Sequence, residues 1–232
     1  MNYKNINFFI NHNNVFFKDK KKNFKNLKKE ILVELNRWSA RDVINSYVSN
    51  SLSKKYNAVI KSYPGYEPFY NQNIFQKILI KFKWKFANFF AIKTFKIYQS
   101  FGVKSFFLPI LNKSQIKESE NIFKKLKKKI NTKEKLIDLK IRNIYVGDLI
   151  YNSYLKIHRK IYFNFDEVDF KEFLFYSIQL FIFWYDYLNK KKVSALVINH
   201  SVYIHSINHR IAISFKIPVY YGGNRSAFKY DK

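Results

Sequence analysis

The sequence predicts an α/β fold, a Rossmann-like parallel sheet flanked by helices. Five short apolar runs alternate with longer stretches of helical periodicity, a pattern that favours parallel strands joined by right-handed crossovers. Hydrophobic residues make up 47% of the 232 residues, which is enough for a substantial core. Neither an internal repeat nor a linker rich in Pro, Gly or Ser divides the chain. We therefore expect a basic entry segment over 1–29 and one Rossmann-like domain over 30–232.

The expected strands are the apolar runs that end at turn residues or charges. The first is ILVEL at 31–35, directly after the basic run 18–29. The second covers 58–63 and is closed by a Pro-Gly turn. The other three are expected over 103–110, 193–198 and 218–221.

Helices fill the segments between these strands. Ser39 or Asp42 can cap a helix that runs to about residue 55. The run 168–189 is apolar nearly all round, so we expect it to be buried. The remaining helices are expected over 74–100, over 114–130, from Asp148 onwards, and over 201–215.

The net charge of +27 invites a nucleic-acid interpretation, but the kind of basic residue argues against it. Only six of the 43 basic residues are Arg, whereas a phosphate-binding surface favours the planar fork of Arg. Excess Lys together with abundant Asn, Ile, Phe and Tyr is the bias of an AT-rich genome. We expect no nucleic-acid partner, and weak attraction to an anionic inner membrane remains an alternative.

The sequence favours a cytoplasmic protein, with peripheral contact at the inner membrane left open. It contains no cysteine, so disulfides and thiolate chemistry are excluded. The start lacks the apolar core of a signal peptide. The best apolar run, 173–185, covers 13 residues, fewer than the roughly 20 that cross a bilayer.

The stretch ALVINHSVYIHSINHR at 195–210 carries the strongest functional signal, because three of the five histidines follow one expected strand. Ligands of open α/β sheets bind at the carboxyl ends of strands. Ser201 would cap the next helix, whose free N–H groups suit a phosphate. His200 is the candidate general base, and binding a loop carbonyl is its structural alternative. His205 and His209 have the spacing of a zinc pair without a third ligand or a general base, so we expect no metal. We expect a polar helix face or an acceptor-contacting surface there, with His209 as a substrate-binding candidate.

Further candidates belong to other expected strand ends and to a helix start. Asp148 is a candidate catalytic group that could instead be a helix N-cap. Arg210 could bind a carboxylate or phosphate, and a structural ion pair is an equal alternative. Glu34 and Tyr63 lie at the ends of two expected strands, and Gly222 follows a third, so we expect them at the same crevice as substrate-binding residues. No GxGxxG fingerprint, P-loop or GxSxG elbow occurs, and no cofactor is expected.

Two segments resemble bacterial surface-polysaccharide biosynthesis proteins of the capsule and lipopolysaccharide type, which look like GT-B glycosyltransferases. The segments are NIYVGDLIYNSYLK (143–156) and ALVINHSVYIHSINHRIAISFKIPVYY (195–221). The stretch ILVELNRWSARDVINSYVSNSLSKKYNAVIKSY is similar to the opening β-α-β unit of that family. The resemblance covers roughly 30–230. It marks six residues, namely Gly147, Asp148, Tyr151, His200, Tyr203 and Arg210.

The resemblance implies an acceptor-side domain that transfers a sugar, or a polyol phosphate, from a nucleotide-activated donor to a saccharide acceptor. Asn152 stands where the family pattern has an acidic residue. The resemblance extends only to the N-terminal half of a GT-B fold, so the nucleotide-sugar site is expected in a second domain or a partner chain. The alternatives are another enzyme of similar fold, such as a nucleotide-sugar epimerase or a phosphotransferase, and a non-catalytic remnant or membrane-surface binding module.

Overall fold

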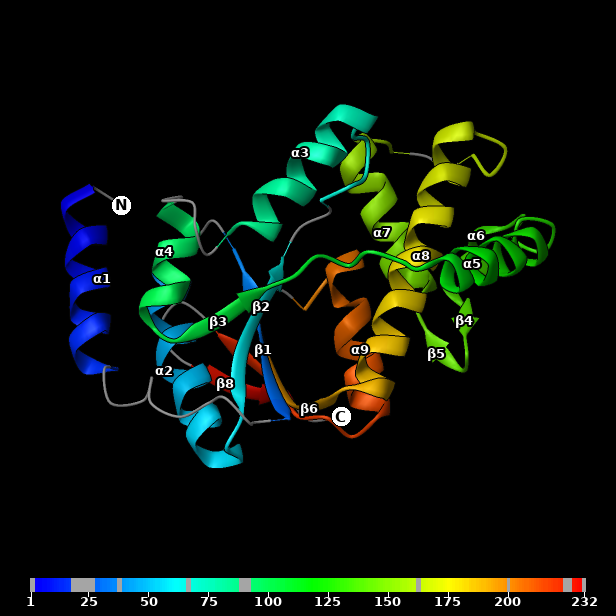
Figure 1. Cartoon of the computed structure of the whole chain (residues 1–232). Helices are drawn as coiled ribbons and strands as arrows, with labels where there is room; N and C mark the ends of the chain where they lie inside the picture. Colours follow the sequence, from blue (N-terminus) through cyan, green and yellow to red (C-terminus); the bar gives the residue numbers. More distant parts are fainter. Residues whose placement is uncertain are drawn as a thin grey trace. The chain divides into compact units, whose positions relative to one another are not determined.

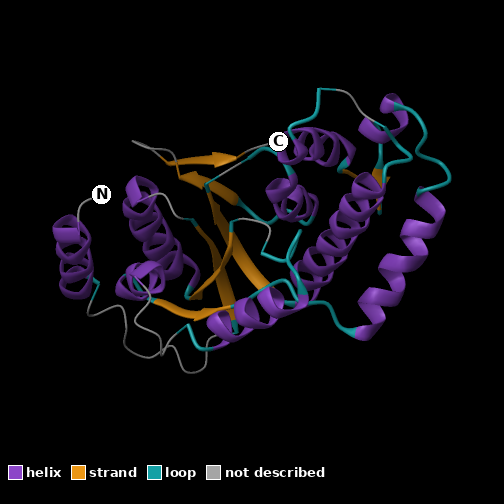
Figure 2. Cartoon of the chain, turned by 90° about the horizontal axis from the view of Figure 1, so that it is seen from above, coloured by secondary structure: helices purple, strands orange, loops and turns teal. Residues whose placement is uncertain are grey.

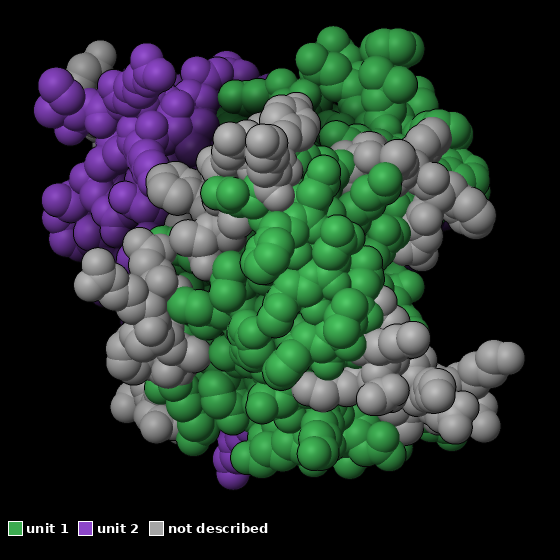
Figure 3. Space-filling view, turned by 90° about the vertical axis from the view of Figure 1, so that its left-hand side faces the viewer, with its two compact units in different colours: residues 1–108, 191–199, 217–232 green, residues 109–190, 200–216 purple. Residues whose placement is uncertain are grey.

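A computed structural model describes residues 3–17, 28–36, 39–65, 68–87, 93–161, 164–199, 201–222 and 227–230. The chain forms two compact units, coloured separately in Figure 3. Unit 1 consists of Met1–Leu108, Lys191–Asn199 and Ile217–Lys232. Unit 2 consists of Pro109–Lys190 and His200–Lys216. The chain therefore leaves unit 1 twice and returns to it twice.

Unit 1 is a sheet with helices alongside (Figures 1 and 2). The strand order is β3-β2-β1-β6-β7-β8, with the first five strands parallel and β8 antiparallel to β7. This confirms the expected α/β fold with a parallel, Rossmann-like sheet. The elements of unit 1 are α1 (Tyr3–Phe16), β1 (Lys29–Leu35), α2 (Ser39–Tyr56), β2 (Val59–Pro64), α3 (Ile74–Lys85), α4 (Lys93–Ser100), β3 (Val103–Phe106), β6 (Lys192–Ile198), β7 (Val219–Gly222) and β8 (Ala227–Tyr230).

The central strands are continuous apolar runs because parallel strands are buried on both faces. Ile31, Leu32 and Val33 of β1 are all fully buried. Alternate residues point to one face, where Ile31, Val33 and Leu35 of β1 join Ala195 and Val197 of β6. These five belong to one apolar core with residues of α1, α2 and α4.

Three elements of unit 1 differ from the expectation. Residues 3–16 form a helix, α1, whose Ile6 and Phe9 enter the core; the run 18–27 lies outside the described residues. The expected strand 103–110 ends at Phe106, because Pro109 lacks the N–H that a ladder needs. The expected helix 74–100 is two helices, α3 and α4.

Unit 2 is mainly helical. Its longest helix, α8 (Val168–Lys190), buries Phe173, Ile178, Phe181 and Trp184, as its apolar composition predicts. None of the helices in the described part of the chain is long and apolar enough to cross a membrane. The other elements of unit 2 are α5 (Lys113–Leu126), α6 (Lys133–Ile137), β4 (Lys140–Ile141), β5 (Ile144–Tyr145), α7 (Gly147–His158), the 3₁₀ helix η2 (Ile204–Ser206) and α9 (Ile207–Ser214).

The helix after β6 begins later than expected. Residues 204–206 form η2, and α9 starts at Ile207 rather than at Ser201. The N–H of Ile204 donates to Ser153 Oγ at 2.6 Å, so a side chain of α7 satisfies this backbone group. The expectation that Ser201 caps this helix is therefore wrong.

Candidate functional site

In unit 1, the candidate site is the carboxyl edge of the sheet between β1 and β6. Chain connections run from β1 through β2 to β3 on one side and from β6 to β7 on the other. The strand order thus reverses between β1 and β6, which makes this point the topological switch of the sheet. Open α/β sheets bind their ligands in the crevice outside such a switch point.

Glu34 lies at this edge and is almost fully buried, with 1% exposure. The backbone N–H of Asn199 donates to Glu34 Oε2 at 2.7 Å, and Asn36 Nδ2 donates to Oε1 at 3.3 Å. The hydroxyl of Tyr98 donates to the carbonyl oxygen of Glu34 at 2.9 Å. The carboxylate therefore ties the end of β1 to the residue that follows β6.

Asn199 extends this network to α2 and β7. Its Nδ2 donates to the carbonyl oxygen of Glu34 at 3.3 Å, and its own carbonyl accepts from Arg41 at 2.5 Å. Asn45 Nδ2 donates to Asn199 Oδ1 at 3.2 Å. Gly222 lies so close that a Cβ there would be 2.7 Å from Asn45 Oδ1. Glycine at 222 thus allows β7 to approach the polar side chains at the switch point.

Asp42, in the first turn of α2, is buried and incompletely bonded. Its Oδ1 has no hydrogen-bond partner among the described residues. Burial raises the pKa of Asp42 to about 7, while a hydrogen bond with Tyr98 acts in the opposite direction. Burial and the nearby Asp42 charge together hold the pKa of the Tyr98 hydroxyl well above its usual range. A carboxyl group that is half protonated near neutral pH is a candidate proton donor or acceptor.

The end of β2 meets the same edge. Tyr63 is buried, and its ring centre lies 6.2 Å from that of Phe107. The N–H of Gly65 donates to the carbonyl oxygen of Leu35 at 2.9 Å. A Cβ on Gly65 would lie 2.3 Å from Glu34 Oε1, so glycine is required for this close approach. Glu34, Tyr63 and Gly222 therefore do lie at one edge of unit 1.

In unit 2, Asp148 and Arg210 form a bidentate ion pair. Arg210 donates through both terminal nitrogens to the two oxygens of Asp148, each at 2.6 Å, and also to the carbonyl oxygen of Tyr145 at 3.0 Å. The side chains are 38% and 31% exposed, respectively. The N-cap position of α7 is Val146, so the N-cap alternative for Asp148 is wrong.

Gly147, the first residue of α7, is constrained by backbone contact. A Cβ there would overlap the carbonyl oxygen of Leu136, at a separation of only 1.7 Å. Leu136 belongs to α6, whose end packs against the start of α7. The Gly-Asp pair at 147–148 therefore combines a close helix contact with an ion-pair partner for Arg210.

Tyr151 and Tyr203 each face a lysine. Tyr151 follows Asp148 by three residues on α7, and Lys133 Nζ lies 5.2 Å from its ring centre. Lys156 Nζ lies 3.9 Å from the ring centre of Tyr203. Tyr203 has a φ of 64°, a backbone region that side chains disfavour and that functional sites often contain.

The histidines occupy different environments. Burial lowers the pKa of His205 to about 4, with a smaller contribution from Lys156, so this imidazole is neutral at pH 7. His209 is buried on α9, and Ser201 is half-buried. His200 lies outside the described residues. Within the described ranges, no three His, Asp or Glu side chains are grouped closely enough to hold a metal ion.

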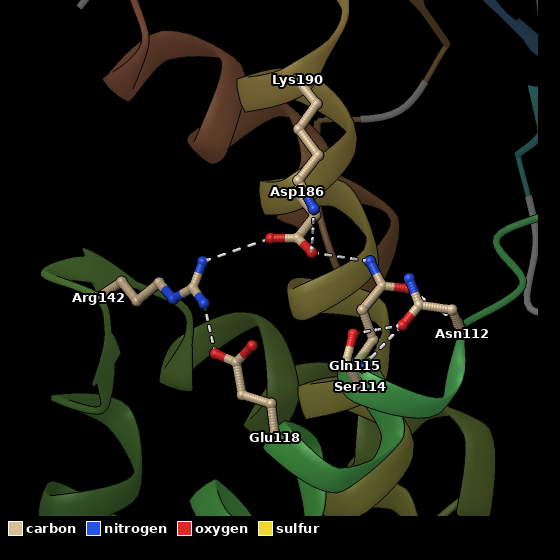
Figure 4. A network of polar contacts seen from close by, with 7 residues as sticks. All are labelled: Asn112, Ser114, Gln115, Glu118, Arg142, Asp186 and Lys190. Atoms are coloured by element: carbon tan, nitrogen blue, oxygen red, sulfur yellow. Dashed lines mark hydrogen bonds and ion pairs between the residues drawn. The ribbon is translucent and has the colours of Figure 1, made fainter.

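Unit 2 also contains a polar network that centres on Arg142 and that no sequence motif predicts (Figure 4). Arg142 pairs with Glu118 of α5 and lies 3.7 Å from Asp186 of α8. Its guanidinium carbon also lies 4.1 Å from the ring centre of Tyr185. Gln115 Nε2 donates to Asp186 at 3.0 Å. The network joins α5, α8 and the β4–β5 turn, and this role is structural.

No protein-family model matches the chain, and comparison with curated proteins and with solved structures gave no significant match.

Proposed function

We propose that the chain is the acceptor-side domain of a GT-B-like glycosyltransferase in bacterial surface-polysaccharide assembly. The observation that supports this most is the strand order, because it puts a switch point between β1 and β6 with polar side chains gathered around it. The resemblance of 143–156 and 195–221 to surface-polysaccharide proteins adds the reaction class. In this proposal the nucleotide-sugar site lies in a second domain or a partner chain.

The proposed reaction transfers a glycosyl group to a hydroxyl of the acceptor. The hydroxyl oxygen forms a bond to the anomeric carbon, and the bond from that carbon to the diphosphate oxygen breaks with its electron pair. His200 or Asp148 takes the hydroxyl proton. Because Arg210 engages both oxygens of Asp148, His200 is the stronger candidate base, and Asp148 then positions Arg210.

A membrane-surface binding role is the second candidate. The net charge of +27 favours contact with anionic lipid, and helix α3 exposes several apolar side chains. The two roles do not exclude each other, because the membrane contact would use α3 and the transfer would use other residues.

A binding screen tests the acceptor-side assignment. The labelled chain is applied to an array of bacterial surface oligosaccharides, and nucleotide sugars are titrated separately. We expect binding to a subset of the oligosaccharides and weakening by His200→Ala, with His12→Ala as a matched control on α1. Failure to bind any saccharide, or tight binding of a nucleotide sugar by the chain alone, contradicts the assignment.

A further inference from the structure

Helix α3 packs on the core of unit 1 by one narrow stripe and exposes apolar residues on the opposite side. Ile80 and Trp84 make the core contacts of the helix, with the Trp84 ring centre 5.3 Å from that of Phe95. The exposed fractions on the opposite side range from 50% to 79%. The residues concerned are Ile74, Phe75, Ile78, Leu79 and Phe82, which we call the outer face of α3.

The outer face is continuous along the helix. Ile74, Ile78 and Phe82 are spaced four residues apart, as are Phe75 and Leu79, so each set lies in one row along the helix. Twelve residues of helix span about 18 Å. Contiguous exposed apolar surface of this kind marks a place of association.

Lysines accompany this face, and the stretch of sequence that contains it has no acidic residue. Lys77, Lys81, Lys83 and Lys85 are all exposed on α3. The segment 68–117 contains nine lysines and not a single Asp or Glu. An apolar stripe with lysines beside it matches a surface that is apolar below and anionic above, because long lysine side chains reach up to phosphate groups.

We propose that α3 docks the protein on an anionic lipid bilayer, with its outer face among the acyl chains and its lysines at the phosphates. A single exposed helix fits a flat bilayer surface, whereas a protein groove would need acidic walls on both sides. Docking by α3 rests on the membrane-surface role of the proposed function and does not require glycosyl transfer. The docking and the glycosyl transfer can therefore fail separately.

The helix is ready for docking without refolding. Asn73 and Gln76 form a reciprocal capping box at its start, with Gln76 N–H donating to Asn73 Oδ1 at 2.8 Å. Lys83 and Lys85 lie in its last turn, where positive charge favours the helix dipole. Binding therefore avoids the ordering entropy that an unfolded segment would lose.

Vesicle co-sedimentation of the full chain tests the docking. The probes are phosphatidylcholine vesicles with and without phosphatidylserine. We expect binding to the anionic vesicles, and a loss of roughly tenfold or more in the triple variant Phe75→Ser, Ile78→Ser, Phe82→Ser. The matched control is Phe8→Ser, Val15→Ser, Ile161→Ser, which removes three even more exposed apolar residues elsewhere and should bind like the wild type.

Charge reversal on α3 tests the lysines separately. Lys77→Glu, Lys81→Glu, Lys83→Glu should abolish binding at moderate salt. The same change in net charge at Lys124, Lys125 and Lys128, at the end of α5 and just after it, should reduce binding less. Equal effects of the α3 and control sets overturn the inference. Failure of the wild type to bind either vesicle type also overturns it. So does a wild type that is an oligomer without lipid, if the apolar triple variant is a monomer.

Discussion

Glu34 in unit 1 and Asp148 in unit 2 are both carboxylates at places that the sequence associates with function, but they are held differently. Glu34 is 1% exposed and is bonded by a backbone N–H and an asparagine amide. Asp148 is 38% exposed and is bonded by the fork of Arg210. The first holds two strand ends together, whereas the second remains within reach of a ligand.

The difference shows how burial separates a structural carboxylate from one that could take part in binding. A buried acceptor with backbone partners cannot be replaced without leaving a donor unsatisfied. A partly exposed ion pair contributes little to stability, because water screens it, and its arginine can exchange one anion for another. Substitution of Glu34 should therefore affect folding more than binding, and substitution of Asp148 should affect binding more than folding.

Loss of the Glu34 side chain should have the largest effect on stability. Glu34→Ala leaves the N–H of Asn199 unsatisfied and removes a charge-assisted bond, so we expect the free energy of unfolding to fall by about 3–5 kcal/mol. Glu34→Gln keeps an acceptor and should lose less. Urea denaturation measures both, and a loss below about 1 kcal/mol for the alanine variant contradicts the strand-tying role.

Asp42 is a third carboxyl group, buried like that of Glu34 but with one oxygen that has no hydrogen-bond partner among the described residues. Because its folded pKa of about 7 exceeds the ordinary 3.8, folding takes up a proton between these values. The stability that this proton provides is present below pH 4 and is lost as the pH rises through 7, by up to roughly 4 kcal/mol. Asp42→Asn should remove this loss. Denaturation of both proteins at pH 4 to 8 measures it, and parallel pH profiles contradict the prediction.

Gly65→Ala should disturb the side chain of Glu34, because Gly65 follows β2 and Glu34 lies on the neighbouring strand β1. The new Cβ would meet Glu34 Oε1 at 2.3 Å, and overpacking of this kind costs about 1–3 kcal/mol. The same substitution should cost clearly less in a Glu34→Ala background, where the clashing carboxylate is gone. A double-mutant cycle gives the coupling energy, and additive effects would exclude the close contact.

The ion pair of unit 2 should give the smallest effect on stability. Asp148→Asn and Arg210→Lys both break the bidentate geometry, but the side chains are about one-third exposed. We expect the free energy of unfolding to fall by about 1 kcal/mol or less. Thermal unfolding checks this, and a loss as large as that of Glu34→Ala would show that the pair is structural.

The sequence predicted the sheet well because buried parallel strands leave a local signal. The runs at 31–35 and 193–198 are continuously apolar, and both are central strands in the structure. Helix α1 left no such signal, since its asparagines favour other conformations and its order depends on packing in the core. β8 was missed because a short edge strand at 227–230 carries little apolar pattern.

Long-range contacts limited what could be predicted of the candidate site. Glu34 and Gly222 were expected at one sheet edge, because parallel strands align their carboxyl ends. An ion pair of Arg210 was one alternative from the sequence, but its partner Asp148 lies 62 residues away and was not identified. The start of α9 was predicted too early in the sequence. The N–H of Ile204 is bonded by Ser153, a residue of α7 that is far away in the sequence.

Saccharide affinity and stability, measured together on Asp148→Asn and Glu34→Gln, test the central claim most directly. The ligand is the best-bound oligosaccharide of the array, and affinity is expressed per folded molecule by calorimetry. We predict that Asp148→Asn weakens binding by tenfold or more and lowers the free energy of unfolding by no more than about 1 kcal/mol. Glu34→Gln should do the reverse, with affinity nearly unchanged and stability reduced. Loss of affinity in Glu34→Gln with unchanged binding in Asp148→Asn would contradict the account.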